Sequence, residues 1–200
     1  MPKLFLLPGH FDAHDPGAVA NGIEERTMAL HFAHLCLETL LPLKLFAAIL
    51  LPQAQAPLAE RINWVNAQAS AADYLLSLHF NAAENEQAEG IEAWINDEKT
   101  ATRQQAEILL EQISKCTQQK VRGVKSDDQN RLGRLGILHT KPLGCLLELG
   151  FITNPAEAEL IKRISFPNKV AKGIAKAYQA LLKGPQKIKT RKNLLARLIR

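Results

Sequence analysis

The sequence predicts a single α/β domain with a twisted, mostly parallel sheet that is flanked by helices. Short apolar runs of strand length, such as Leu4–Leu7 and Tyr74–Phe80, alternate with longer stretches of helical periodicity. This alternation is typical of a parallel sheet whose crossover connections are helices. The length of 200 residues and the hydrophobic content of 46% suit one domain with a substantial core.

Breaker residues mark the order of the expected elements. Pro42 ends the first helix, and Pro57 stands at the start of the second. Aspartate, asparagine, arginine and glycine crowd the expected loop Lys125–Gly136. The remaining periodic segments give, in order, strand Leu4–Leu7, helix Arg26–Leu41, apolar run Leu43–Leu50, helix Pro57–Ala69, strand Tyr74–Phe80, strand Ile91–Ile95, helix Glu98–Gln119, strand Cys145–Leu149, and helices Pro155–Arg163 and Pro167–Leu182.

The excess positive charge of the chain is concentrated in its last residues. Residues 183–200 contain seven of the 25 Lys and Arg residues and no acidic residue, so residues 1–182 hold 18 basic and 20 acidic groups. We therefore expect one folded domain at 1–183 and a basic amphipathic tail at 184–200. The domain has no charge excess that favours nucleic acid. The tail either docks on an anionic membrane or wall polymer, or is a solvated terminus that aids solubility.

Cysteine usage and the N-terminal residues bear on compartment. Three scattered cysteines without a CxxC pair predict neither a disulfide framework nor a thiolate metal site. The run Leu4–Leu7 is too short for the apolar region of a signal peptide or for a membrane span. We therefore expect synthesis in the cytoplasm without a Sec-type signal peptide, and no transmembrane segment.

A carboxylate interrupts the apolar strand CLLELGF at Glu148. Removing an ionised carboxylate from water costs several kcal/mol unless another group pairs with it. The ordinary explanation is a salt bridge or an exposed strand edge. The functional explanation requires a cation or a reacting proton close to Glu148.

Several polar candidates are expected at one edge of the sheet. His10 follows the first strand, His79 and Glu148 lie near the ends of later strands, and Glu24 and Glu25 precede the first helix. Ligands of such sheets gather at the carboxyl ends of the strands. Two imidazoles and one carboxylate form a ligand set of hydrolytic zinc sites. Each of these residues taken singly also fits an ordinary structural role.

Four ordered segments resemble the zinc-dependent N-acetylmuramoyl-L-alanine amidases, a family of bacterial cell-wall amidases and phage endolysins. LPGHFDAHDPGAVANGIEER resembles the family's opening zinc-binding stretch, and ERINWVNAQASAADYLLSLHFNAA resembles the segment that ends in Ser-x-His-x-Asn-Ala. GIEAWI is similar to the strand that follows, and CLLELGFITNPAEAELI to the Glu-Leu-Gly-Phe-x-x-Asn motif. RGVKSDD also resembles the family's loop before the last strand. The resemblance runs from about Leu4 to Leu182.

The resemblance implies one zinc ion held by His10, Glu25 and His79. Glu25 is preferred to Glu24 because the family's ligand glutamate precedes a basic residue, here Arg26. The resemblance also implies that Glu148 is the catalytic general base that accepts a proton from a zinc-activated water and returns it to the leaving amine.

Three further residues have less definite roles. His14 competes with His10 as a ligand, because Phe11–His14 stands where the family usually has glycines. Asn81 either binds substrate or fixes the end of its strand. His139 stands where the family often has arginine, and it either donates a hydrogen bond to the tetrahedral intermediate or is a satisfied histidine.

The substrate implied by the resemblance is peptidoglycan, cut at the amide between N-acetylmuramic acid and L-alanine. Two other functions remain open at this point: another zinc peptidoglycan hydrolase, such as a carboxypeptidase or deacetylase, and an inactive wall-binding module. We expect action on the cell wall after release, as in phage or prophage lysis, or cytoplasmic recycling.

Overall fold

The computed structural model describes residues 1–10, 12, 14–52, 56–97, 100–130 and 133–183. In this part of the chain, six strands form one sheet in the order β4-β1-β5-β8-β6-β7. The pairs β4–β1, β1–β5, β5–β8 and β6–β7 are parallel, whereas β6 pairs antiparallel with β8. The strands are β1 (Leu4–Pro8), β4 (Ile49–Leu50), β5 (Tyr74–Asn81), β6 (Ile91–Ile95), β7 (Val121–Ser126) and β8 (Leu143–Phe151).

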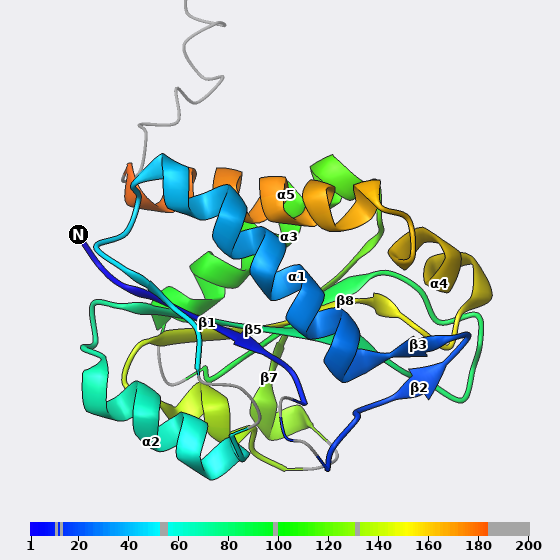
Figure 1. Ribbon diagram of the computed structural model, residues 1–200, viewed down its shortest axis with the longest axis horizontal. Coiled ribbons are helices and arrows are strands. Elements are labelled where there is room, and N and C mark those ends of the chain that lie inside the picture. Colours follow the sequence, from blue (N-terminus) through cyan, green and yellow to red (C-terminus); the bar gives the residue numbers. More distant parts are fainter. Residues whose placement is uncertain (11, 13, 53–55, 98–99, 131–132, 184–200) are drawn as a thin grey trace, which may run out of the picture.

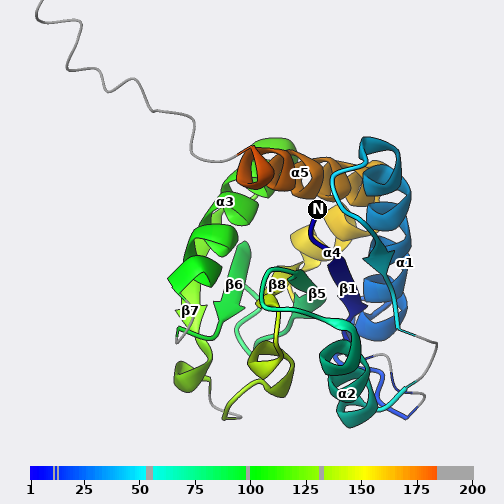
Figure 2. The same cartoon turned by 90° about the vertical axis from the view of Figure 1, so that its left-hand side faces the viewer.

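Helices cover both faces of the sheet, so the predicted α/β fold with a mostly parallel sheet is confirmed. Figure 1 shows α1, α3 and α5 on one side of the sheet and α2 on the other. The turned view in Figure 2 shows the same layers, with α2 opposite α5. The helices are α1 (Glu25–Leu40), α2 (Leu58–Gln68), α3 (Thr100–Thr117), α4 (Pro155–Ile161) and α5 (Ser165–Leu182).

The larger core lies between the sheet and the helices α1, α3 and α5. Alternate residues of the central strands, among them Leu6, Leu76, Leu78 and Leu147, are fully buried there. Their neighbours along the strands face α2, since successive strand residues point to opposite faces. This periodicity explains why the central strands read as nearly continuous apolar runs.

The smaller core lies between the sheet and α2, on the face of the sheet that carries His79 and Glu148. Phe5, Leu75 and Leu146 are buried in it, and the ring of Phe5 meets Trp64 of α2 edge-on at a centroid distance of 5.6 Å. His79 lies four residues after Leu75, and Glu148 two residues after Leu146. Both therefore emerge on the α2 face, beyond the apolar cluster.

Several short elements were not expected from the sequence. β2 (Val19–Ala20) and β3 (Ile23–Glu24) form a small antiparallel hairpin before α1. The apolar run Leu43–Leu50 forms a strand only at its end, because its first residues belong to the 3₁₀ helix η1 (Leu41–Leu43) and a turn. Two further 3₁₀ helices lie between β7 and β8, namely η2 (Asp127–Gln129) and η3 (Gly136–His139).

Candidate metal centre

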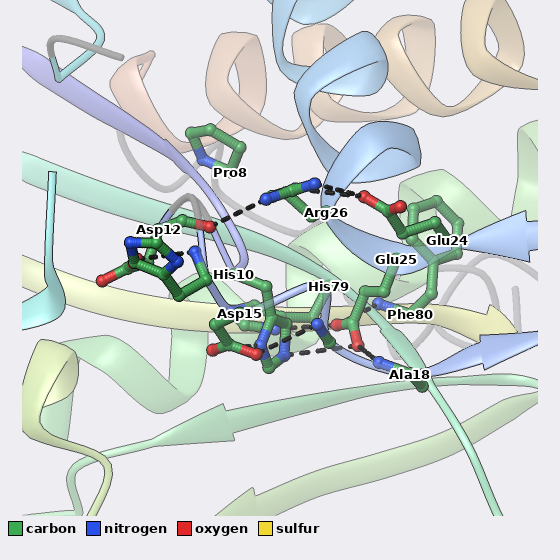
Figure 3. A network of polar contacts seen from close by, with 12 residues as sticks. Pro8, His10, Asp12, Asp15, Ala18, Glu24, Glu25, Arg26, His79 and Phe80 are labelled. Carbon is green, nitrogen blue, oxygen red and sulfur yellow. Dashed lines mark hydrogen bonds and ion pairs between the residues drawn. The ribbon is translucent and has the colours of Figure 1, made fainter. Parts of the chain in front are cut away.

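Three potential metal ligands converge from three separate elements. His10 follows β1, Glu25 is the first residue of α1, and His79 lies near the end of β5. One ligand atom from each lies within 4.8 Å of the other two. The two imidazole rings meet edge-on with centroids 5.2 Å apart. Figure 3 shows these side chains pointing toward one another beside the start of α1.

Glu25 links the two histidines. Its Oε1 lies 3.0 Å from His79 Nδ1 and accepts a hydrogen bond from Phe80 N–H at 3.1 Å. Its Oε2 lies 3.3 Å from His10 Nε2 and accepts from Ala18 N–H at 3.1 Å. The side chain of Glu25 is 5% exposed. Two backbone donors therefore hold this buried carboxylate between the two rings (Figure 3).

Asp15 orients the first histidine, a role that the sequence analysis missed. Its Oδ2 lies 2.8 Å from His10 Nδ1, and its Oδ1 accepts from Gly17 N–H at 3.0 Å. A carboxylate on one imidazole nitrogen fixes the tautomer and leaves the other nitrogen for a metal. The only signal in the sequence was the aspartate of the DPG turn.

The proximity of charges shifts the pKa values of the cluster. The hydrogen bond to Glu25 raises the pKa of His10 to about 9, despite the opposing effect of burial, and Asp15 adds to the rise. Burial alone would raise the pKa of Glu25, but His10 and His79 outweigh it and hold the pKa well below its usual range. Glu25 is therefore ionised at neutral pH and ready to pair with a cation.

Close packing of glycine backbone shapes the cluster. A Cβ built on Gly9 would lie 2.5 Å from the ring of His79. A Cβ built on Gly17, where φ is +67°, would lie 2.7 Å from both Glu25 Oε2 and the His10 ring. Both positions therefore require glycine for the two rings and the carboxylate to approach.

Glu148 stands beside the metal-ligand cluster with one oxygen unsatisfied. It pairs in register with His79 across β5 and β8, so the two side chains lie on the same face. Its Oε2 is buried and lacks a hydrogen-bond partner among the described residues. Burial raises the pKa of Glu148 well above its usual range, and the charges of Glu25 and Glu92 raise it further. A cation in the cluster would oppose that rise.

Asn81 borders the same cavity as Glu148. This cavity has a volume of about 820 Å³ and lies at the end of β5. The side-chain amide of Asn81 donates to Glu92 Oε1 at 3.1 Å, and its carbonyl oxygen accepts from Ala82 N–H at 2.9 Å. Both ends of the amide are therefore engaged within the protein.

The other candidates lie outside the three-residue cluster. Glu24 accepts hydrogen bonds from Arg26 and Thr27. His14 is exposed, and its backbone N–H donates to Asp12. His139 has Asp127 Oδ2 2.7 Å from Nε2 and the Asn96 amide 3.2 Å from Nδ1.

Arg61 is a second residue that the sequence analysis missed. It belongs to α2, is 6% exposed, and donates from Nη1 to the carbonyl oxygen of Pro8 at 2.9 Å. Its Nε is buried without a hydrogen-bond partner in the described structure. Arg61 also lines a cavity of about 140 Å³ together with His10 and His79, and its hydrogen bond to Pro8 links α2 to the end of β1.

The residues of this cluster fit a zinc ion. Two imidazole nitrogens and one carboxylate oxygen are a donor set that zinc accepts while keeping a position open for water. Glu148, which pairs in register with His79, adds a buried carboxylate oxygen that has no hydrogen-bond partner in the described structure. The fold and the cluster thus define the chain as an α/β protein with a candidate metal-binding site formed by two histidines and one glutamate.

Comparison with known proteins identifies the family. The profile of N-acetylmuramoyl-L-alanine amidases matches residues 4–180, and this chain belongs to that family. It is 32% identical over 180 residues to the N-acetylmuramoyl-L-alanine amidase CwlM of Bacillus licheniformis, covering 88% of this chain and 66% of the relative. It is 30% identical over 186 residues to the endolysin of Bacillus phage SPP1, covering 91% of this chain and 67% of that protein. The chain thus spans about two thirds of the length of both relatives.

Solved structures support the fold. The crystal structure of an N-acetylmuramoyl-L-alanine amidase from Clostridium difficile 630 superposes with a TM-score of 0.80 at 23% sequence identity. The match covers 92% of this chain and 98% of that one. The likeness extends over almost the whole described domain. In the described residues, no helix is long and apolar enough to cross a membrane.

Proposed function

We propose that this protein hydrolyses the amide bond between N-acetylmuramic acid and L-alanine in peptidoglycan, with one zinc ion held by His10, Glu25 and His79. Membership of the amidase family supports the reaction and the substrate. Its relatives include proteins named as amidases and an endolysin, which also supports this reaction. The clustered nitrogen and oxygen donors support the metal.

Glu148 is the proposed catalytic general base. The observation that carries this role is its buried Oε2, which has no hydrogen-bond partner in the described structure although it lies one strand from His79. When bound, zinc supplies Lewis-acid chemistry and makes a neighbouring water more acidic. Glu148 takes a proton from the attacking water and returns it to the leaving amine.

The charge of Glu148 depends on its surroundings. Burial and the charges of Glu25 and Glu92 favour the protonated form. A base must be ionised before it can accept a proton, so the role requires positive charge in the cluster to stabilise the carboxylate. Metal binding at His10, Glu25 and His79 is thus coupled to the ionisation of Glu148.

Asn81 and His139 have supporting roles in this proposal. Asn81 borders the cavity beside Glu148 and would position the peptide or the loop that follows β5. His139 could reach a reacting group only by giving up Asp127 or Asn96. Its part in binding the tetrahedral intermediate stays a prediction.

Digestion of purified peptidoglycan tests the reaction and the metal together. The protein is used as isolated, after chelation, and after zinc is restored, and the released peptides are identified by mass spectrometry. We expect intact stem peptides with a free L-alanine amino terminus, which are lost on chelation and recovered with zinc.

Other reaction products would contradict the proposed activity and indicate a different one. Release of a carboxy-terminal residue would indicate a carboxypeptidase, and release of acetate a deacetylase. No release by zinc-loaded protein would favour a wall-binding module.

Where the enzyme acts is part of the proposal. We expect peptidoglycan as its partner, reached after release in phage or prophage lysis or during recycling. The proposed tail at 184–200 lies outside the described residues, so its binding to an anionic membrane or wall polymer stays a prediction.

A further inference from the structure

A buried carboxylate organises two cations beside the proposed catalytic residue. Glu92 is 1% exposed and lies on β6. Its Oε2 lies 2.7 Å from both Arg122 Nε and Lys125 Nζ. Its Oε1 accepts from the amide of Asn81. One carboxylate is therefore shared by two cations and one amide.

Aromatic rings hold the two cations in place. The guanidinium of Arg122 lies 4.8 Å from the centre of the Phe151 ring, and Lys125 Nζ lies 5.0 Å from the centre of the Trp94 ring. Cations stacked on aromatic rings lose part of their hydration. Both cations are about one-third exposed, so they remain accessible from solvent.

The local charge leaves room for an anion. Among the described ion pairs, Glu92 is the only carboxylate that meets Arg122 or Lys125. Arg122, Lys125 and Glu92 together thus carry one net positive charge on the wall of the 820 Å³ cavity. The other acidic residues of the lining are Glu148, which lies beside His79 of the metal-ligand cluster, and Glu84, which is exposed.

The distance from the metal-ligand cluster suggests which part of a substrate reaches this charge. Glu92 pairs in register with Glu148, which pairs with His79, so the three residues form a row across β6, β8 and β5. Neighbouring strands are about 4.8 Å apart, which puts Glu92 roughly 10 Å from His79. An extended peptide covers this distance with about three residues.

We propose that Arg122 and Lys125 form a carboxylate-binding subsite for the peptide on the amine side of the cleaved bond, and that Glu92 is a positioning residue for both cations. The proposal rests on the proposed function, because the cleaved amide must lie at the His10–Glu25–His79 cluster. The enzyme would then prefer stem peptides with a free carboxylate on the second or third residue over peptides in which that group is amidated.

Two synthetic N-acetylmuramoyl peptides test the subsite. They share one sequence and differ only in the carboxyl groups of the second and third residues, which are either free or converted to carboxamides. We expect the zinc-loaded wild-type protein to cleave the carboxylate form roughly tenfold to a hundredfold more efficiently, since a charge-assisted contact is worth that factor. The difference should lie mainly in KM.

Substitutions in the subsite test whether Arg122 and Lys125 cause the preference for the carboxylate peptide. Lys125→Gln and Arg122→Gln should each raise KM for the carboxylate peptide and leave cleavage of the carboxamide peptide nearly unchanged. Lys115→Gln is the matched control, because Lys115 is an exposed lysine that pairs with Glu111 outside the cavity. Glu92→Gln should raise KM for the carboxylate peptide alone, without a fall in kcat for either peptide, whereas a general structural defect would lower kcat for both peptides.

The outcomes separate this inference from the proposed function. If Lys125→Gln lowers cleavage of both peptides equally, or if wild-type protein does not distinguish them, the subsite is overturned and the amidase activity stands. If wild-type protein cleaves neither peptide, the proposed function fails and the subsite fails with it. Lys125→Arg keeps the positive charge and should keep the preference for the carboxylate peptide. Loss of that preference in Lys125→Arg would also contradict the proposal.

Discussion

The positions of His79 and His14 make only His79 a candidate metal ligand. His79 contacts Glu25 and His10, whereas His14 is exposed and lies outside the three-residue cluster. We expect His79→Ala to weaken zinc binding by at least about a hundredfold, because an imidazole ligand is lost outright. His14→Ala should retain zinc. Elemental analysis of the purified variants measures both, and equal zinc contents would contradict the ligand assignment.

Asp73 contributes stability that depends on pH. Burial alone would raise its pKa, but hydrogen bonds from Lys3 N–H, Ser70 N–H and the Ser70 hydroxyl outweigh it and lower the pKa. Because the folded pKa lies below the unfolded value of about 4, the stabilisation is present above that pH and is lost as pH falls through the folded pKa.

Asp73→Asn tests this directly. We expect it to lower the free energy of unfolding by about 1 kcal/mol at neutral pH, with a smaller difference near pH 3. Urea denaturation at the two pH values gives the comparison. Asp97→Asn is the control, since Asp97 and its partner Arg103 are exposed and the change should be under about 0.5 kcal/mol. A loss at Asp73 that does not vary with pH would contradict this explanation.

The loop between β1 and α1 depends on glycine at a position of close contact. Gly17 and Gly22 both have positive φ, at +67° and +76°, but only Gly17 approaches Glu25 and His10. A side chain at either position costs about 1 kcal/mol of backbone strain. We expect Gly17→Ala to lose zinc as well, while Gly22→Ala keeps it. Thermal unfolding reports the backbone strain in each variant, and zinc content reports the loss of the close contact with Glu25 and His10. Zinc loss in both variants would refute the contact argument.

Strong periodicity and composition predicted the main elements well. Strands β1, β5 and β8 are buried apolar runs, and α3 and α5 carry long helical patterns, so their bounds differ from expectation by only a few residues. β7 was missed because Val121–Ser126 is polar and half exposed, and it pairs only with β6. Its residues therefore lack the apolar signal of a central strand.

The site was only partly predictable, because its supporting residues act through the folded arrangement. The histidine and glutamate candidates stood at strand and helix ends, where an α/β sheet collects ligands. Nothing in the sequence indicated the ion pairs of Glu92, because its partners Arg122 and Lys125 lie 30 or more residues away along the chain. Arg61 likewise meets Pro8 from 53 residues away.

Metal binding should stabilise the whole domain, because the ligands tie together the end of β1, the start of α1 and β5. At a zinc concentration roughly a hundred times Kd, binding adds about 2.7 kcal/mol to the free energy of unfolding. For a domain of this size we expect a rise in Tm of about 5–10 °C. Scanning calorimetry of chelated and zinc-restored protein tests this, and identical Tm values would argue against a shared metal.

The most direct test of the proposed mechanism is the Glu148→Gln variant, with zinc content and peptidoglycan cleavage measured on the same sample. Glutamine keeps the size of the side chain but cannot accept the proton. We predict a full complement of zinc and a loss in kcat of roughly a hundredfold to ten-thousandfold. Zinc-loaded Glu148→Gln protein that cleaves peptidoglycan at the wild-type rate would contradict the role of Glu148 as general base.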